Sequence, residues 1–195
     1  MILHLVTIGI IVCSFLTLGV SGERMMGIGR WSVSDVQPCA NDAEMPWMMR
    51  VRRHELNHTH DAYDADVNTL ADFDDSVGIR IDACMMMDGG CKRFMTMAYD
   101  CARKFINVAA RENMRRAFVL AGVDPPEFPI PIGEYQVRNF VLDMENLSKQ
   151  GVYGDFISDA FITKGGQDMA CLKLLLRFEQ LDDWPPLTWL KSGYP

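Results

Sequence analysis

The apolar residues of this chain recur most clearly at the spacing of an α-helix. Between Cys91 and Ala121 they return every three or four positions, and Gly122 and Pro125 then supply a helix stop. The same spacing recurs over shorter stretches, at 61–77, 134–149, 155–161 and 168–181. The chain shows neither a sustained alternation of apolar and polar residues nor an internal repeat. The pattern therefore predicts an all-α fold, a small bundle of about four or five helices.

The first 22 residues stand apart because they contain no Asp, Glu, Lys or Arg. An apolar block from Leu5 to Leu18 leads into small residues that end at Gly22, as is typical of a secretory signal peptide over 1–22. An uncleaved anchor is the alternative, since about 20 apolar residues are long enough to span a bilayer. We expect a secreted, extracellular protein that has no membrane contact after signal removal.

A cluster of basic residues follows a stretch without periodicity. Arg50, Arg52 and Arg53 form the sequence Arg-Val-Arg-Arg, which resembles the sites cut by furin-like proprotein convertases. Residues 23–53 contain several Gly and Pro residues and no sustained period, so they are predicted to be a pro-segment. The helical domain would then be 54–195. The alternative is a solvated basic turn that no protease recognises.

The cysteine pattern suggests a domain stapled by disulfides. Cleavage after Arg53 leaves four cysteines, which a secreted chain is expected to oxidise. A helix that carried both Cys91 and Cys101 would hold them ~15 Å apart, beyond disulfide reach. We expect the pairs Cys84–Cys91 and Cys101–Cys171. The alternative joins Cys84 to Cys101 and Cys91 to Cys171.

Two further features fit the secretory route and narrow the class of partner. Asn57 and Asn146 head Asn-x-Thr/Ser sequons, so both are candidate glycosylation sites on the surface. The chain has a formal net charge of -7 and a pI near 5.0. Such an acidic protein is a poor general binder of nucleic acid or of anionic membranes, so we expect no nucleic-acid partner.

One motif carries possible enzyme chemistry. The sequence from His54 to His58 matches HExxH, and on a helix this spacing places two imidazoles on one face for zinc, with Glu55 as general base. Asp64 lies where one class of zinc peptidases carries a third ligand, and this resemblance implies a zinc metallopeptidase. The same cluster, with His60, also fits loose binding of Zn or Cu, a pH-sensing role, or a solvated polar segment. No other cofactor and no other catalytic motif is indicated, so the expectation is that the protein is not an enzyme.

Three functions from different classes follow from these features. The first is a secreted helical protein that is matured from a precursor and binds an extracellular protein partner. The second is a carrier of a small apolar ligand in a pocket lined by Met and Phe, suggested by the chain's 14 methionines. The third is the zinc peptidase.

Overall fold

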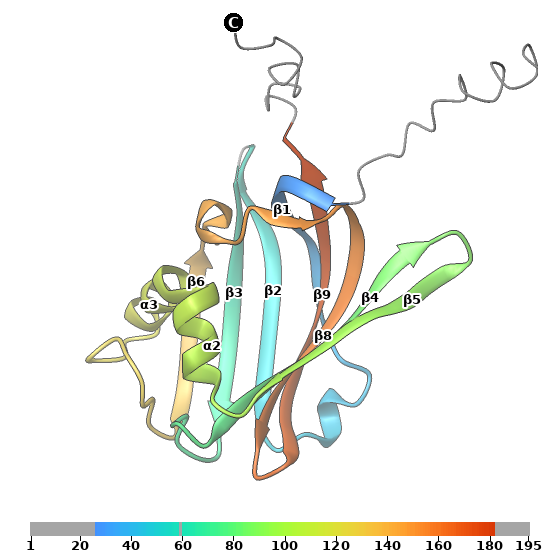
Figure 1. Ribbon diagram of the computed structural model, residues 1–195. Helices are drawn as coiled ribbons and strands as arrows, with labels where there is room; N and C mark the ends of the chain where they lie inside the picture. Colours follow the sequence, from blue (N-terminus) through green and yellow to red (C-terminus); the bar gives the residue numbers. More distant parts are fainter. Residues whose placement is uncertain (1–25, 59, 182–195) are drawn as a thin grey trace, which may run out of the picture.

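The computed structural model describes residues 26–58 and 60–181 of the chain. It is 60% strand and 15% helix, so the expected all-α helical bundle is wrong. Figure 1 shows the antiparallel strands curving into a half-barrel. The strands are β1 (Met26–Pro38), β2 (Met48–Asn57), β3 (His60–Thr69), β4 (Val77–Met87), β5 (Gly90–Tyr99), β6 (Gly133–Phe140), β7 (Gln150–Val152), β8 (Gly154–Lys164) and β9 (Gln167–Gln180). The helices are α2 (Ala102–Ala109) and α3 (Arg111–Leu120), with short 3₁₀ turns η1 (Asp42–Glu44) and η2 (Met144–Asn146).

The strands form two antiparallel sheets. One has six strands in the order β5-β4-β8-β9-β1-β7, and the other has three in the order β2-β3-β6. β2 contacts both β1 and β9, which brings the three-stranded sheet against the larger one. In Figure 1, α2 and α3 lie beside β3 and β6, while the β4–β5 hairpin projects away on the opposite side. The two sheets therefore enclose a concave side that the helices cover only in part.

The register of the large sheet identifies its two faces. Ser158 of β8 is opposite Leu174 of β9, and because side chains alternate along a strand, Ile162 lies on the same face as Ser158. Ile162 packs against the core cluster between the sheets, so this is the inner face. The outer face instead carries ion pairs such as Asp159 with Lys173.

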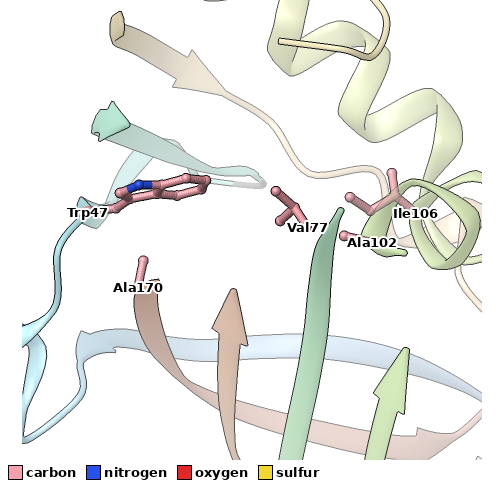
Figure 2. Packing of buried hydrophobic residues seen from close by; sticks show 5 residues of the cluster. All are labelled: Trp47, Val77, Ala102, Ile106 and Ala170. Atoms are coloured by element: carbon pink, nitrogen blue, oxygen red, sulfur yellow. The ribbon is translucent and has the colours of Figure 1, made fainter. Parts of the chain in front are cut away.

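The best-packed core lies at one end of the half-barrel and joins four parts of the chain. Figure 2 shows Trp47, which directly precedes β2, with its indole ring directed toward Val77 of β4. Ala102 and Ile106 of α2 lie beyond Val77, and Ala170 of β9 completes the cluster. Trp47 is only 2% exposed. Residues before position 54 therefore contribute directly to the core.

The predicted long helix from Cys91 to Ala121 is replaced by a strand followed by two short helices. β5 occupies the first part through Tyr99, and α2 begins only at Ala102. The sequence of this stretch resembles a helix because β5 contains a β-bulge. At the bulge, Phe94 is the extra residue opposite β4. The bulge shifts the alternation by one position, so apolar residues fall three and four apart as they would on a helix.

Two sequence expectations concern the membrane and the leader. The predicted signal peptide, 1–22, lies outside the described residues. Within the described ranges, no helix combines the length and the apolar character needed to cross a membrane.

Candidate functional site

The inner face of the large sheet is a nearly continuous apolar surface. The strands β4, β8 and β9 direct every second side chain toward it, as the register requires. These inner residues are Val77, Ile79, Ile81, Ala83, Met85, Phe156, Ser158, Ala160, Ile162, Ala170, Leu172, Leu174, Leu176 and Phe178. Thirteen of these fourteen positions are apolar, and Ser158 is the one polar side chain among them. At the end of the face, opposite Val77, Lys164 also occupies an inner position, and its amine is bound to the Asp72 carbonyl oxygen and the Asp74 carboxylate.

The middle of this face is incompletely covered. Ile81, Leu172 and Leu174 lie on interior strands of the sheet, yet each remains partly accessible to solvent. In a sheet that packs fully against a second layer, such residues are buried. Their accessibility contrasts with Val77 and Ala170, which are fully enclosed at the core end. The protein therefore leaves apolar surface on its concave side that its own described side chains do not cover.

Aromatic rings gather at the end of the inner face that lies away from the core cluster. The Trp31 ring of β1 lies 4.8 Å from that of Phe178, and Tyr153 stacks on Phe178 at 5.6 Å. Phe156 links this group to the β4–β5 hairpin, because its ring is 5.2 Å from that of Phe94. Between these rings and the core cluster the small residues Ala83, Ser158 and Ala160 lie beside Ile81, Leu172 and Leu174.

The outer face of the same sheet has the opposite character. Arg80 forms a two-pronged contact with Asp168, with both N–O distances 2.9 Å, and its guanidinium lies over the ring of Phe161. A hydrogen bond from the Thr96 hydroxyl, helped by Arg80, holds the pKa of the Asp82 carboxyl below its usual value. Each of these charged side chains has an oppositely charged partner on the same face, so the outer face is an ordinary solvated surface.

The basic cluster lies on a paired strand. Arg50, Arg52 and Arg53 belong to β2 and pair residue by residue with β3. Arg53 also donates hydrogen bonds to the backbone oxygen of Ser34 in β1 (3.0 Å) and to the Asp61 carboxylate (2.7 Å). All three arginine residues are exposed, as a cleavage site would be, but they lie on a regular strand rather than on an irregular segment. Arg53 connects the two sheets.

This geometry predicts resistance to convertases. We expect the folded protein to stay intact with a furin-like convertase, because a protease must bind an extended, unpaired chain. The measurement is the size of the secreted chain under reducing conditions, beside an Arg53→Ala variant. Urea-unfolded protein, diluted into the protease, is the control and should be cut. Two reduced fragments from the folded wild type that vanish in the variant would contradict this prediction and support the pro-segment.

The disulfides differ from the expected set in one pair. Cys84 and Cys91 are joined across the Gly-Gly turn of the β4–β5 hairpin. Cys171 is joined to Cys39, so the expected Cys101–Cys171 bridge is not formed. Cys101 is a free thiol whose sulfur lies 3.8 Å from the Asp75 carboxylate. The assumption that Cys39 departs with a pro-segment removed the correct partner from consideration.

The HExxH motif does not lie on a helix. His54 is in β2 and His58 in the following turn, and four residues of extended chain span ~13 Å, unlike one turn of helix. His54 Nε2 is 3.1 Å from Asn139 Oδ1, and Asp64 accepts a hydrogen bond from the Asn139 amide. His60 Nδ1 is 3.3 Å from the Asn57 side chain. In the described part of the chain, no three His, Cys, Asp or Glu side chains are placed to hold a metal ion.

The two sequons lie near the ends of structural elements. Asn57 is exposed at the end of β2, and Asn146 ends the turn η2. Glycosylation of either residue stays a prediction.

A surface hollow of about 300 Å³ is lined by Asp74, Asp75, Ser76, Arg103 and Pro129. Its two carboxylates already form ion pairs within the protein, Asp75 with Arg103 and Asp74 with Lys164. Their charge is therefore neutralised without a ligand.

The sequence contains a signal for the inner face that the helical interpretation missed. Leu172, Leu174 and Leu176 occupy alternate positions, as do Ile79 and Ile81, but Leu175 and Ile157 on the outer face obscure this two-residue period.

No protein-family model matches the chain, and no curated protein matches it either. The functional proposal therefore rests on the geometry of the chain itself.

Proposed function

We propose that this protein is a secreted carrier that binds a small apolar ligand against the inner face of its six-stranded sheet. The observation that supports the proposal is the continuous apolar surface on β4, β8 and β9, part of which stays solvent-accessible inside the half-barrel. Secretion is inferred from the leader over 1–22 and agrees with two disulfides.

The energetics favour an apolar ligand at this surface. Each Å² of apolar surface removed from water contributes roughly 25 cal/mol, so covering several partly exposed Leu and Ile side chains supports useful affinity. The middle of the inner face contains no charged group whose burial by a ligand would be unfavourable. Leucine and methionine also adapt to ligand shape more readily than rigid rings.

A partner-binding role is the second candidate, and a different surface supports it. The β4–β5 hairpin exposes Met86, Met87 and Phe94, with exposed fractions of 45%, 47% and 42%. Exposed apolar side chains on a projecting hairpin are typical of a contact with another protein. Binding of an extracellular protein to this hairpin should be lost in a Met86→Ser, Met87→Ser double variant. This variant leaves the inner face intact.

Two adjacent leucines provide a matched test of the carrier proposal. Leu174 faces inward and Leu175 outward on the same strand, and both are partly exposed. Leu174→Gln should weaken binding of the fluorescent apolar probe N-phenyl-1-naphthylamine by roughly tenfold or more, whereas Leu175→Gln should change it little. Fluorescence titration measures both, with urea unfolding to show that each variant is folded.

The outcomes separate the candidates. Equal effects of the two substitutions, or no probe binding by the wild type, would contradict the carrier proposal. Native mass spectrometry of the protein from secreting cells gives an independent check, because a carrier should retain a small apolar molecule that Leu174→Gln loses.

A further inference from the structure

Ser158 is the polar residue in the middle of the inner face. It lies in the middle of β8, opposite Ala83 on one side and Leu174 on the other. Only 4% of the residue is exposed. Within the described residues its hydroxyl makes no hydrogen bond, although the other two buried polar residues, Thr69 and Asn113, are both bonded. A hydroxyl that no protein group binds, in the middle of an otherwise apolar surface, is free to form a hydrogen bond with a ligand.

We infer that the Ser158 hydroxyl binds the polar group of the apolar ligand and so selects ligands with one neutral hydrogen-bonding group. This inference rests on the proposed carrier function. A serine hydroxyl can donate one hydrogen bond and accept others, which suits an alcohol, a ketone or an ester. The hydrogen bond left unmade in the empty protein would then be made in the complex.

The surroundings of Ser158 exclude a charged ligand group at this position. No Lys, Arg or His neighbours Ser158 on the inner face, and the cation at the end of this face, Lys164, is already bound to the Asp72 carbonyl oxygen and the Asp74 carboxylate. A carboxylate or ammonium buried here would lose its hydration without gaining an opposite charge. The ligand class is therefore a neutral, mainly hydrocarbon molecule with a single hydroxyl or carbonyl group.

The position of Ser158 also suggests how the rest of the ligand lies. The partly exposed Leu174 and Ile81 flank it, so the surface next to the hydroxyl is reachable. Gly154 marks the start of β8, and the four residues from there to Ser158 span ~14 Å, about the length of ten methylene groups. A chain of about that length, with its polar group at Ser158, would run along β8 toward the aromatic rings.

The test compares 1-decanol with 1-fluorodecane, which matches it in length but lacks the hydroxyl. Competition against N-phenyl-1-naphthylamine measures both affinities. Ser158→Ala should weaken 1-decanol binding roughly two- to tenfold and leave 1-fluorodecane unchanged. The same variant should not lower the urea midpoint of the empty protein, because it removes an unpaired hydroxyl. Ser32→Ala, on the outer face of β1, is the control and should alter neither probe.

The possible failures are distinguishable. If the wild type binds neither probe, the carrier function itself is contradicted. If both bind but Ser158→Ala weakens them equally or not at all, only the assigned role of Ser158 is overturned. A markedly lower urea midpoint for the empty variant would show that the hydroxyl is structural, and this too would overturn the inference.

Discussion

Replacing Cys39 and Cys171 together by alanine is expected to lower the free energy of unfolding by about 5 kcal/mol. The bridge joins residues 132 apart in sequence, and it ties the end of β1 to the middle of β9. Cross-linking so long a loop removes much conformational freedom from the unfolded chain, which is the main source of the effect. Urea unfolding of the oxidised protein, monitored by tryptophan fluorescence, measures the change.

The second disulfide is the matched control. Cys84 and Cys91 are separated by only 7 residues, so their replacement by alanine should cost about 2 kcal/mol. The difference between the two double variants is the informative quantity. Equal losses, or a larger loss for the hairpin bridge, would contradict the pairing of Cys39 with Cys171.

Trp47→Ala is expected to destabilise the protein by about 4 kcal/mol. The side chain is 2% exposed and packs against residues of β4, α2 and β9, so truncation leaves a cavity that these three elements would have to close. Urea unfolding measures the loss. A variant as stable as the wild type would show that residues before position 54 are not part of the folded domain, as the pro-segment interpretation requires.

Trp47→Phe is the conservative partner of this experiment. The indole N–H is buried and has no hydrogen-bond partner in the described structure, so its removal sacrifices no bond. Phenylalanine keeps most of the ring contact with Phe73, whose centroid is 6.1 Å away. We expect a loss of less than about 1.5 kcal/mol. A loss as large as that of the alanine variant would indicate that the N–H does make a structural bond.

The sequence was informative where structure depends on neighbouring residues. Asp88-Gly89-Gly90 was predicted as a turn, and both glycines adopt positive φ angles, 94° and 108°, between β4 and β5. Gly122 was predicted to end a helix, and it follows α3 with φ 74°. Glycine adopts these angles without the Cβ clash that other residues suffer, so the residue type alone carries the signal.

The candidate site could be predicted only in its chemistry. The abundance of Met and Phe suggested an apolar ligand, but the expected surroundings were helices. The surface is instead built from alternate residues of β4, β8 and β9, and nothing in the local sequence shows which alternate set faces inward. That choice is made by the pairing of strands, since a shift of one residue would turn every side chain to the other face.

By itself the sequence determined the turns, the helix end, the hairpin disulfide and the acidic, disulfide-compatible character of the chain, because each depends on residues close together. Only the tertiary structure decided that the Leu-rich stretch 167–180 is a strand rather than a helix. Leucine favours helices in isolation, but pairing with β8 and β1 satisfies its backbone and buries one face. The same long-range pairing brings Cys39 to Cys171 and leaves Ser158 unpartnered on the inner face.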